Sequence, residues 1–154
     1  MDNAKRTALM MVLAVLVLTS AGFGSKKCPL TPRAHETGTT QRVNQIKSGN
    51  AQQKAAAAFW LSQQSPLDTS IIDSLVGLLG DKTLVDSSQY RYIVDEHKST
   101  LGEEVALALV RIGPPSIPPL IRVLKTSPEP EARKNAARAL GALHQNGVTD
   151  PNTA

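Results

Sequence analysis

The stretch LALVRIGPPSIPPLIRVLKTSPEPEARKNAARALGAL, residues 107–143, decides the fold of this chain. Apolar residues recur at spacings of three and four on both sides of the breaker Gly113-Pro114-Pro115. This spacing places them on one face of a helix. Pro118 and Pro119 fall in the first turn of the second segment, where a missing backbone N–H costs little. We therefore predict helices over residues 103–112 and 116–125 and a third helix that begins at Glu131.

The same pattern occurs upstream. Residues 52–64 contain an alanine-rich run with strong helix formers and neither Gly nor Pro, which predicts a helix. Residues 69–79 repeat the three-and-four spacing, with Asp68 or Thr69 as a natural N-cap and Gly80 as a natural stop. The fragment 43–46 resembles the end of a preceding helix, so the helical region is predicted to begin at about residue 39.

The sequences of these predicted helices are similar to one another. Without gaps, residues 72–76 match 117–121 at an offset of 45, and residues 106–109 match 137–140 at an offset of 31. Residues 54–57 match 134–137 at an offset of 80. Such repetition predicts stacked helical hairpins, because one hairpin alone cannot cover its apolar face. Small residues let helices approach closely, and we expect this role for Ala56, Ala57, Ala106, Ala108, Ala136, Ala137 and Ala139.

The repeated positions also give an expectation for the single tryptophan. Trp60 aligns with Leu109 and Leu140, which favours a place in the core. The alternative is a tryptophan that stacks on a ligand.

The amino-acid sequence of the repeats resembles a known family. The turn Ile112-Gly113-Pro114, the helix start 117–121, the polar turn Pro128-Glu129-Pro130 and Arg133 are similar to the HEAT-repeat superfamily, most of all to the short HEAT-like units of phycobilin lyases. The resemblance covers about residues 40–145. It implies an all-α fold, a short α-solenoid of about three HEAT-like hairpins forming an armadillo-like superhelix. We assign residues 39–145 to this domain. The unit serves scaffolds, adaptors and a few enzymes, so it says little about activity.

One segment departs from the repeat. The difference between the two offsets leaves about 14 extra residues within 82–100, which we expect to form an inserted loop, often on a binding face. Tyr90, Arg91 and Tyr92 form a plausible contact cluster there, since Tyr and Arg dominate interface hot spots. The alternative is that Tyr90, Ile93 and Val94 pin a long loop to the repeat array.

The N-terminal residues 1–24 have the pattern of a secretory signal peptide. Lys5 and Arg6 precede the apolar run 8–18, and small residues follow. The run is shorter than the roughly 20 apolar residues of a membrane span, although an uncleaved anchor through Phe23 is the alternative. We therefore expect export to the periplasm, the cell envelope or the extracellular space. Residues 25–38 are interpreted as a flexible tether, with Cys28 a free thiol, and 146–154 as a polar tail.

Composition excludes several classes of function. The single cysteine among 154 residues cannot build an intramolecular disulfide or a multi-cysteine zinc site. The net charge of +4 is too mild and too scattered for a nucleic-acid binder. The adjacent residues Asp95, Glu96 and His97 point in different directions, and no catalytic motif is present. We expect no cofactor, no metal and no enzymatic activity.

The functional prediction is a non-catalytic protein-binding scaffold or adaptor that acts outside the cytoplasm. The partner is unknown. Family geometry implies that the second helices line a concave face, where Asp73, Arg122 and Lys125 would face a partner. The alternative is a protein related to HEAT-like lyases or isomerases that act on a protein-bound chromophore. We expect membrane contact only through an uncleaved N-terminal segment, and open ends of the array could pair two copies.

Overall fold

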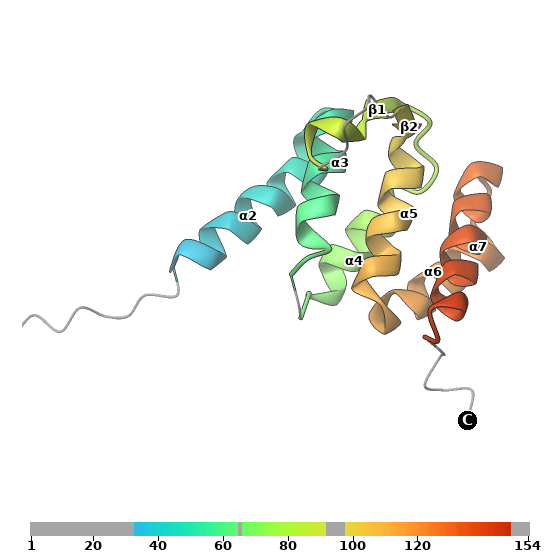
Figure 1. Ribbon diagram of the computed structural model, residues 1–154. Coiled ribbons are helices and arrows are strands. Elements are labelled where there is room, and N and C mark those ends of the chain that lie inside the picture. The colour runs from blue at the N-terminus through green and yellow to red at the C-terminus, as the bar shows by residue number, and fades with distance from the viewer. Residues whose placement is uncertain (1–32, 65, 92–97, 149–154) are drawn as a thin grey trace, which may run out of the picture. The chain divides into compact units, whose positions relative to one another are not determined.

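The computed structural model describes residues 33–64, 66–91 and 98–148, and this part of the chain is mainly helical (Figure 1), as the all-α prediction required. The expected signal peptide 1–24, Cys28, Tyr92, the 95–97 triplet and the end of the polar tail lie outside the described residues. The helices are α2 (Arg33–Ser48), α3 (Ala51–Leu61), α4 (Thr69–Val76), α5 (Leu101–Ile112), α6 (Ile117–Thr126) and α7 (Pro130–Gln145).

The predicted helices are confirmed to within a turn, and local capping explains where they begin. The side chains of Asn50 and Thr100 each accept a hydrogen bond from the backbone N–H three residues later. The side-chain oxygen at that position, of Gln53 or Glu103, accepts in turn from the backbone N–H of the capping residue, which completes a capping box. Asp68 caps α4 through the N–H of Ser70 at 2.9 Å, and this bond holds the pKa of its carboxyl below the usual range. Two boundaries differ. α2 begins at Arg33, inside the segment predicted as a tether, and α4 ends at Val76 with Gly77 as its C-cap, three residues before the predicted stop at Gly80.

The predicted breaker Gly113-Pro114-Pro115 separates α5 from α6, as the sequence suggests. Gly113 has φ +84°, a conformation that glycine adopts without strain. The short 3₁₀ helix Pro114–Ser116 follows. The buried Ser116 hydroxyl donates to the carbonyls of Leu109 (2.9 Å) and Gly113 (2.7 Å), which satisfies the end of α5.

The helices pack in two sets. α5 lies between α3 and α7 and contacts both, while α4 contacts α6 (Figure 1). The predicted hairpins are α3/α4 and α5/α6, so α3, α5 and α7 are first helices and α2, α4 and α6 are second helices. Each second helix also packs on the helix that follows it: α2 on α3, α4 on α5, and α6 on α7. Between them lies one apolar core, whose largest fully buried members include Leu61, Ile72, Leu75, Leu79, Leu101, Leu109, Leu120 and Leu143.

Four apolar residues are less buried than the repeat alignment suggests. Ala137 is exposed and Ala56 only partly buried, whereas the other expected small contacts are buried. Leu124 aligns with the fully buried Leu79 yet is 39% exposed. The reason is that Leu79 lies beneath α5 and α7, while the described residues place no helix beyond α7 to cover Leu124. Trp60 packs against the core but is only partly buried, with the Arg42 guanidinium 5.8 Å from its ring centre.

The inserted segment is not simply a loop. β1 (Leu84–Asp86) pairs antiparallel with β2 (Lys98–Thr100), and the 3₁₀ turn Ser87–Gln89 follows β1. The Gln52 side chain fixes this ribbon to α3, because its amide both donates to and accepts from the backbone of Asp86 (2.7 and 2.9 Å). A long-range contact that no local pattern encodes thus creates the two strands.

Gly102 marks the closest approach in the core. A Cβ at this position would lie 2.3 Å from the Leu79 carbonyl oxygen and 2.8 Å from Nδ2 of Asn135. The Gly102 N–H donates to the carbonyl of Asp81 at 2.9 Å. The chain leaving α4 is therefore clasped between the first turn of α5 and the middle of α7.

Candidate protein-binding surfaces

The predicted site residues fall into two separate groups. Asp73 on α4 and Arg122 on α6 form an ion pair at 2.5 Å, with side chains 52% and 61% exposed. Lys125 is exposed in the last turn of α6. The structure thus brings Asp73 and Arg122 together, and the two charges largely neutralise each other.

Tyr90 and Arg91 belong to the inserted segment and contact the other helix set. Arg91 donates to Glu104 on α5 at 2.5 Å, and Ser99 of β2 donates to the second carboxylate oxygen at 2.7 Å. The Glu104 side chain is 2% exposed and that of Arg91 is 16% exposed. A buried carboxylate is tolerable only when it is paired in this way. These contacts attach the insert to α5.

An aromatic contact attaches the same insert to α3. The rings of Tyr90 and Phe59 lie 5.7 Å apart between centres. The guanidinium groups of Arg91 and Arg111 lie 5.6 and 4.8 Å from the centre of the Phe59 ring, within the range of cation–π attraction. The insert therefore bridges α3 and α5, and we call this covered junction the α3/α5 seam.

The local environment shifts two pKa values in this cluster. Burial, together with the charge of Glu104, raises the pKa of Tyr90. Burial, together with the charge of Arg91, lowers the pKa of Arg111. The Tyr90 hydroxyl and Nε of Arg91 are buried without a hydrogen-bond partner among the described residues. Burial thus favours the uncharged form of both side chains.

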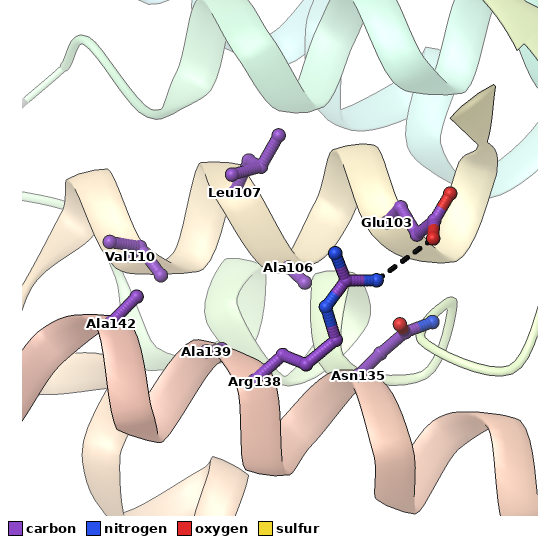
Figure 2. A pocket seen from close by; sticks show the side chains of 8 residues that line it. All are labelled: Glu103, Ala106, Leu107, Val110, Asn135, Arg138, Ala139 and Ala142. Carbon is purple, nitrogen blue, oxygen red and sulfur yellow. Dashed lines mark hydrogen bonds and ion pairs between the residues drawn. The ribbon is translucent and has the colours of Figure 1, made fainter. Parts of the chain in front are cut away.

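Among the residues that the structure describes, no segment covers the equivalent junction between α5 and α7 in this way. It forms an open groove with a volume of about 190 Å³ (Figure 2). Leu107 of α5 lines its edge, with the side chain directed away from α7, and is 45% exposed. The other apolar side chains that line the groove are Ala106, Val110, Ala139 and Ala142. We call this feature the α5/α7 groove.

Polar groups lie at one end of the groove. Arg138 of α7 reaches across to Glu103 of α5 at 2.9 Å, with Asn135 beside it (Figure 2). The backbone N–H of Thr100, helped by Arg138, holds the pKa of Glu103 below its usual range. Asn135 is fully buried, and its Nδ2 donates to the carbonyl of Leu79 at 2.9 Å. Its Oδ1 has no hydrogen-bond partner among the described residues.

The two junctions correspond position by position. At the repeat offset of 31, Glu104 aligns with Asn135, Val105 with Ala136, and Ala108 with Ala139, and all six are buried. Each seam therefore contains one buried polar side chain at the same repeat position. The sequence analysis did not single out Glu104 or Asn135. A signal was available, because both are polar residues at the same repeat position within an otherwise apolar helix face.

The described residues provide no basis for metal chemistry, since they contain no group of three His, Cys, Asp or Glu side chains able to hold an ion. None of their helices is long and apolar enough to cross a membrane. Comparison with known proteins adds no identification, because no family model, curated protein or solved structure matches the chain.

Proposed function

We propose that this chain is a non-catalytic protein-binding scaffold built as a short α-solenoid of HEAT-like repeats. The observation that carries the proposal is the packing order of the helices. The first helix α5 adjoins both α3 and α7, α4 adjoins α6, and each second helix packs on the next first helix. This order is that of repeats which contact only their neighbours. Arrays of this kind serve mainly as binding surfaces, since they offer extended faces rather than enclosed sites.

The exposed charges of α4 and α6 support one binding face. Asp73, Arg122 and Lys125 are exposed on neighbouring second helices. An exposed ion pair such as Asp73–Arg122 contributes only about 0–1 kcal/mol to stability. A partner can therefore exchange its own charges into this pair at little cost to the fold.

We further propose that the scaffold acts outside the cytoplasm. The support is the sequence of residues 1–24, with its basic start, short apolar run and small-residue exit. Mass spectrometry of the chain recovered from the cells that make it would give the N-terminus. We expect a start after Ala21 or Gly24, and an intact Met1 in cytoplasmic material would contradict export.

The binding face is tested by charge reversal. The variant Asp73→Lys, Arg122→Glu, Lys125→Glu should lose at least about tenfold in capture of the partner from an extracytoplasmic extract, followed by quantitative mass spectrometry. The matched control is Glu131→Lys, Lys134→Glu, which reverses an exposed ion pair on α7. If both variants capture the same proteins as the natural chain, the face on α4 and α6 is wrong.

A further inference from the structure

A comparison of the α3/α5 seam with the α5/α7 groove shows which hydrogen-bond contact the groove lacks. In the α3/α5 seam, the buried carboxylate of Glu104 receives hydrogen bonds from Arg91 and Ser99 of the inserted segment. In the α5/α7 groove, the aligned Asn135 keeps a buried carbonyl oxygen without a partner among the described residues. A buried polar atom left unpaired is costly. The groove is therefore short of one hydrogen-bond donor at a defined point.

The orientation of the Asn135 amide is fixed by its surroundings. Nδ2 donates to the Leu79 carbonyl at 2.9 Å, and a flipped amide would set two carbonyl oxygens against each other. Oδ1 is therefore the group that remains, and the amide points from α7 toward α5 (Figure 2). The missing partner must be a donor.

We propose that the α5/α7 groove docks an extended segment of a partner protein that inserts an aromatic side chain with a neutral donor, the indole of Trp or the phenol of Tyr. The inference rests on the proposed binding function and names the contact that a partner makes. In the first seam, Tyr90 and Arg91 of an irregular segment close the junction from outside the helices. The partner segment does the same for the second seam.

Charge and shape select this side chain. Glu103 and Arg138 already neutralise each other at the polar end of the groove, so a charged partner group would meet no free countercharge there. The walls around Leu107 are apolar, and a flat ring buries a large area in a shallow groove. Trp and Tyr combine that ring with one hydrogen-bond donor, and both are enriched at interface hot spots.

In this proposal the Arg138 side chain moves aside to let the donor reach Asn135, and it keeps its ion pair with Glu103. Arg138 is 61% exposed and this pair lies at the surface, so such a movement costs the fold little. Arg138 is thus assigned the role of a movable cover beside the buried oxygen.

A pair of small probes tests the groove on the full chain. Indole and 1-methylindole share the same ring and differ in the N–H. Indole should shift the NMR signals of the Leu107 and Val110 methyl groups and of the Asn135 side-chain amide. 1-Methylindole should bind roughly three- to tenfold more weakly, which is the effect of one neutral hydrogen bond. Equal affinities, or indole shifts confined to other residues, would overturn the proposal.

Two variants connect the probe to the partner. Leu107→Arg places a charge at the exposed edge of the groove, so the fold should persist, while indole binding and partner capture should fall at least about tenfold. Leu84→Arg is the matched control, because Leu84 is an exposed leucine of β1, 68% accessible. Arg138→Ala should bind indole at least as tightly as the natural chain, and weaker binding would refute the role of Arg138 as a cover.

The outcomes separate this inference from the proposed function. If Leu107→Arg abolishes indole binding but leaves partner capture intact, the partner does not use the groove, and the scaffold proposal stands on its other face. If no protein is captured by the natural chain while indole still binds with the expected N–H preference, the scaffold proposal fails and the groove is a small-molecule site instead, which refutes the protein segment as its occupant.

Discussion

The α3/α5 seam and the α5/α7 groove are equivalent helix junctions, one covered by another segment and the other open. Both are formed by neighbouring first helices, and each contains one buried polar side chain at the same repeat position, Glu104 or Asn135. An inserted segment covers the first, whereas the second keeps Leu107 45% exposed. Among the described residues, a segment outside the helices closes the first junction and none closes the second. The difference teaches that helix packing alone leaves such a junction partly exposed.

The largest expected effect compares two leucines of α5. Leu109 is fully buried, so Leu109→Ala should lower the free energy of unfolding by about 3–4 kcal/mol through lost burial and a cavity. Leu107→Ala should cost less than about 1 kcal/mol, because the side chain already contacts solvent at the edge of the open groove. Urea unfolding followed by circular dichroism measures both. Similar losses would show that the groove is closed in solution.

The next comparison uses two adjacent glutamates. Glu104→Gln leaves the Arg91 guanidinium without its buried countercharge and should cost about 3 kcal/mol. Glu103→Gln breaks the more exposed pair with Arg138 and should cost less than about 1 kcal/mol. The same unfolding assay applies, and a cost for Glu104→Gln as small as that of Glu103→Gln would mean that the insert does not depend on this pair.

A smaller effect concerns the hydroxyl of Tyr90. It is buried and forms no hydrogen bond of ordinary geometry among the described residues, although the Glu104 carboxylate lies close enough to raise its pKa. Tyr90→Phe should therefore change stability by less than about 1 kcal/mol. Tyr90→Ala is the control, and it should cost about 2 kcal/mol by removing the ring contact with Phe59. A clear loss of thermal stability in Tyr90→Phe would show that the hydroxyl has a hydrogen bond that holds the seam.

The smallest effect is a pH dependence at the groove. The pKa of Glu103 is lowered in the folded state, so its ionised form stabilises the fold. That contribution is fully present above the ordinary glutamate pKa, about 4.3, and is lost as pH falls through the lowered folded value. The stability difference between the natural chain and Glu103→Gln should therefore shrink between about pH 6 and pH 3 in urea titrations. A difference that stays constant over this range would contradict the contribution of the charge.

Helix positions were predictable because their signals are local. The apolar spacing, Asp68 as N-cap and the Gly113-Pro114-Pro115 breaker each act within one or two turns, and the structure confirms all three. Core membership at the end of the array was predicted less well. Leu124 carries the same local signal as Leu79, but its burial depends on a helix that the described residues do not provide beyond α7.

The candidate site residues could be predicted one by one, but their partners could not. Asp73 and Arg122, for example, pair although they lie 49 positions apart in the sequence, and the spacing of polar residues along each helix does not indicate this pairing. Arg91 was singled out as a contact residue, yet its partner Glu104 was not. The repeat register could have marked Glu104 as buried, but its countercharge comes from the insert, and the sequence does not place that segment.

The sequence by itself determined the helices, their breaks, the repeat and the place of the insert, because propensity, capping and apolar period are properties of neighbouring residues. Only the tertiary structure decided that Leu84–Asp86 and Lys98–Thr100 pair as strands, that Arg91 meets Glu104, and that one seam is covered while the other stays open. The physical reason is that burial and ion pairing depend on which distant segments share a space, and that information is absent from any single stretch of chain.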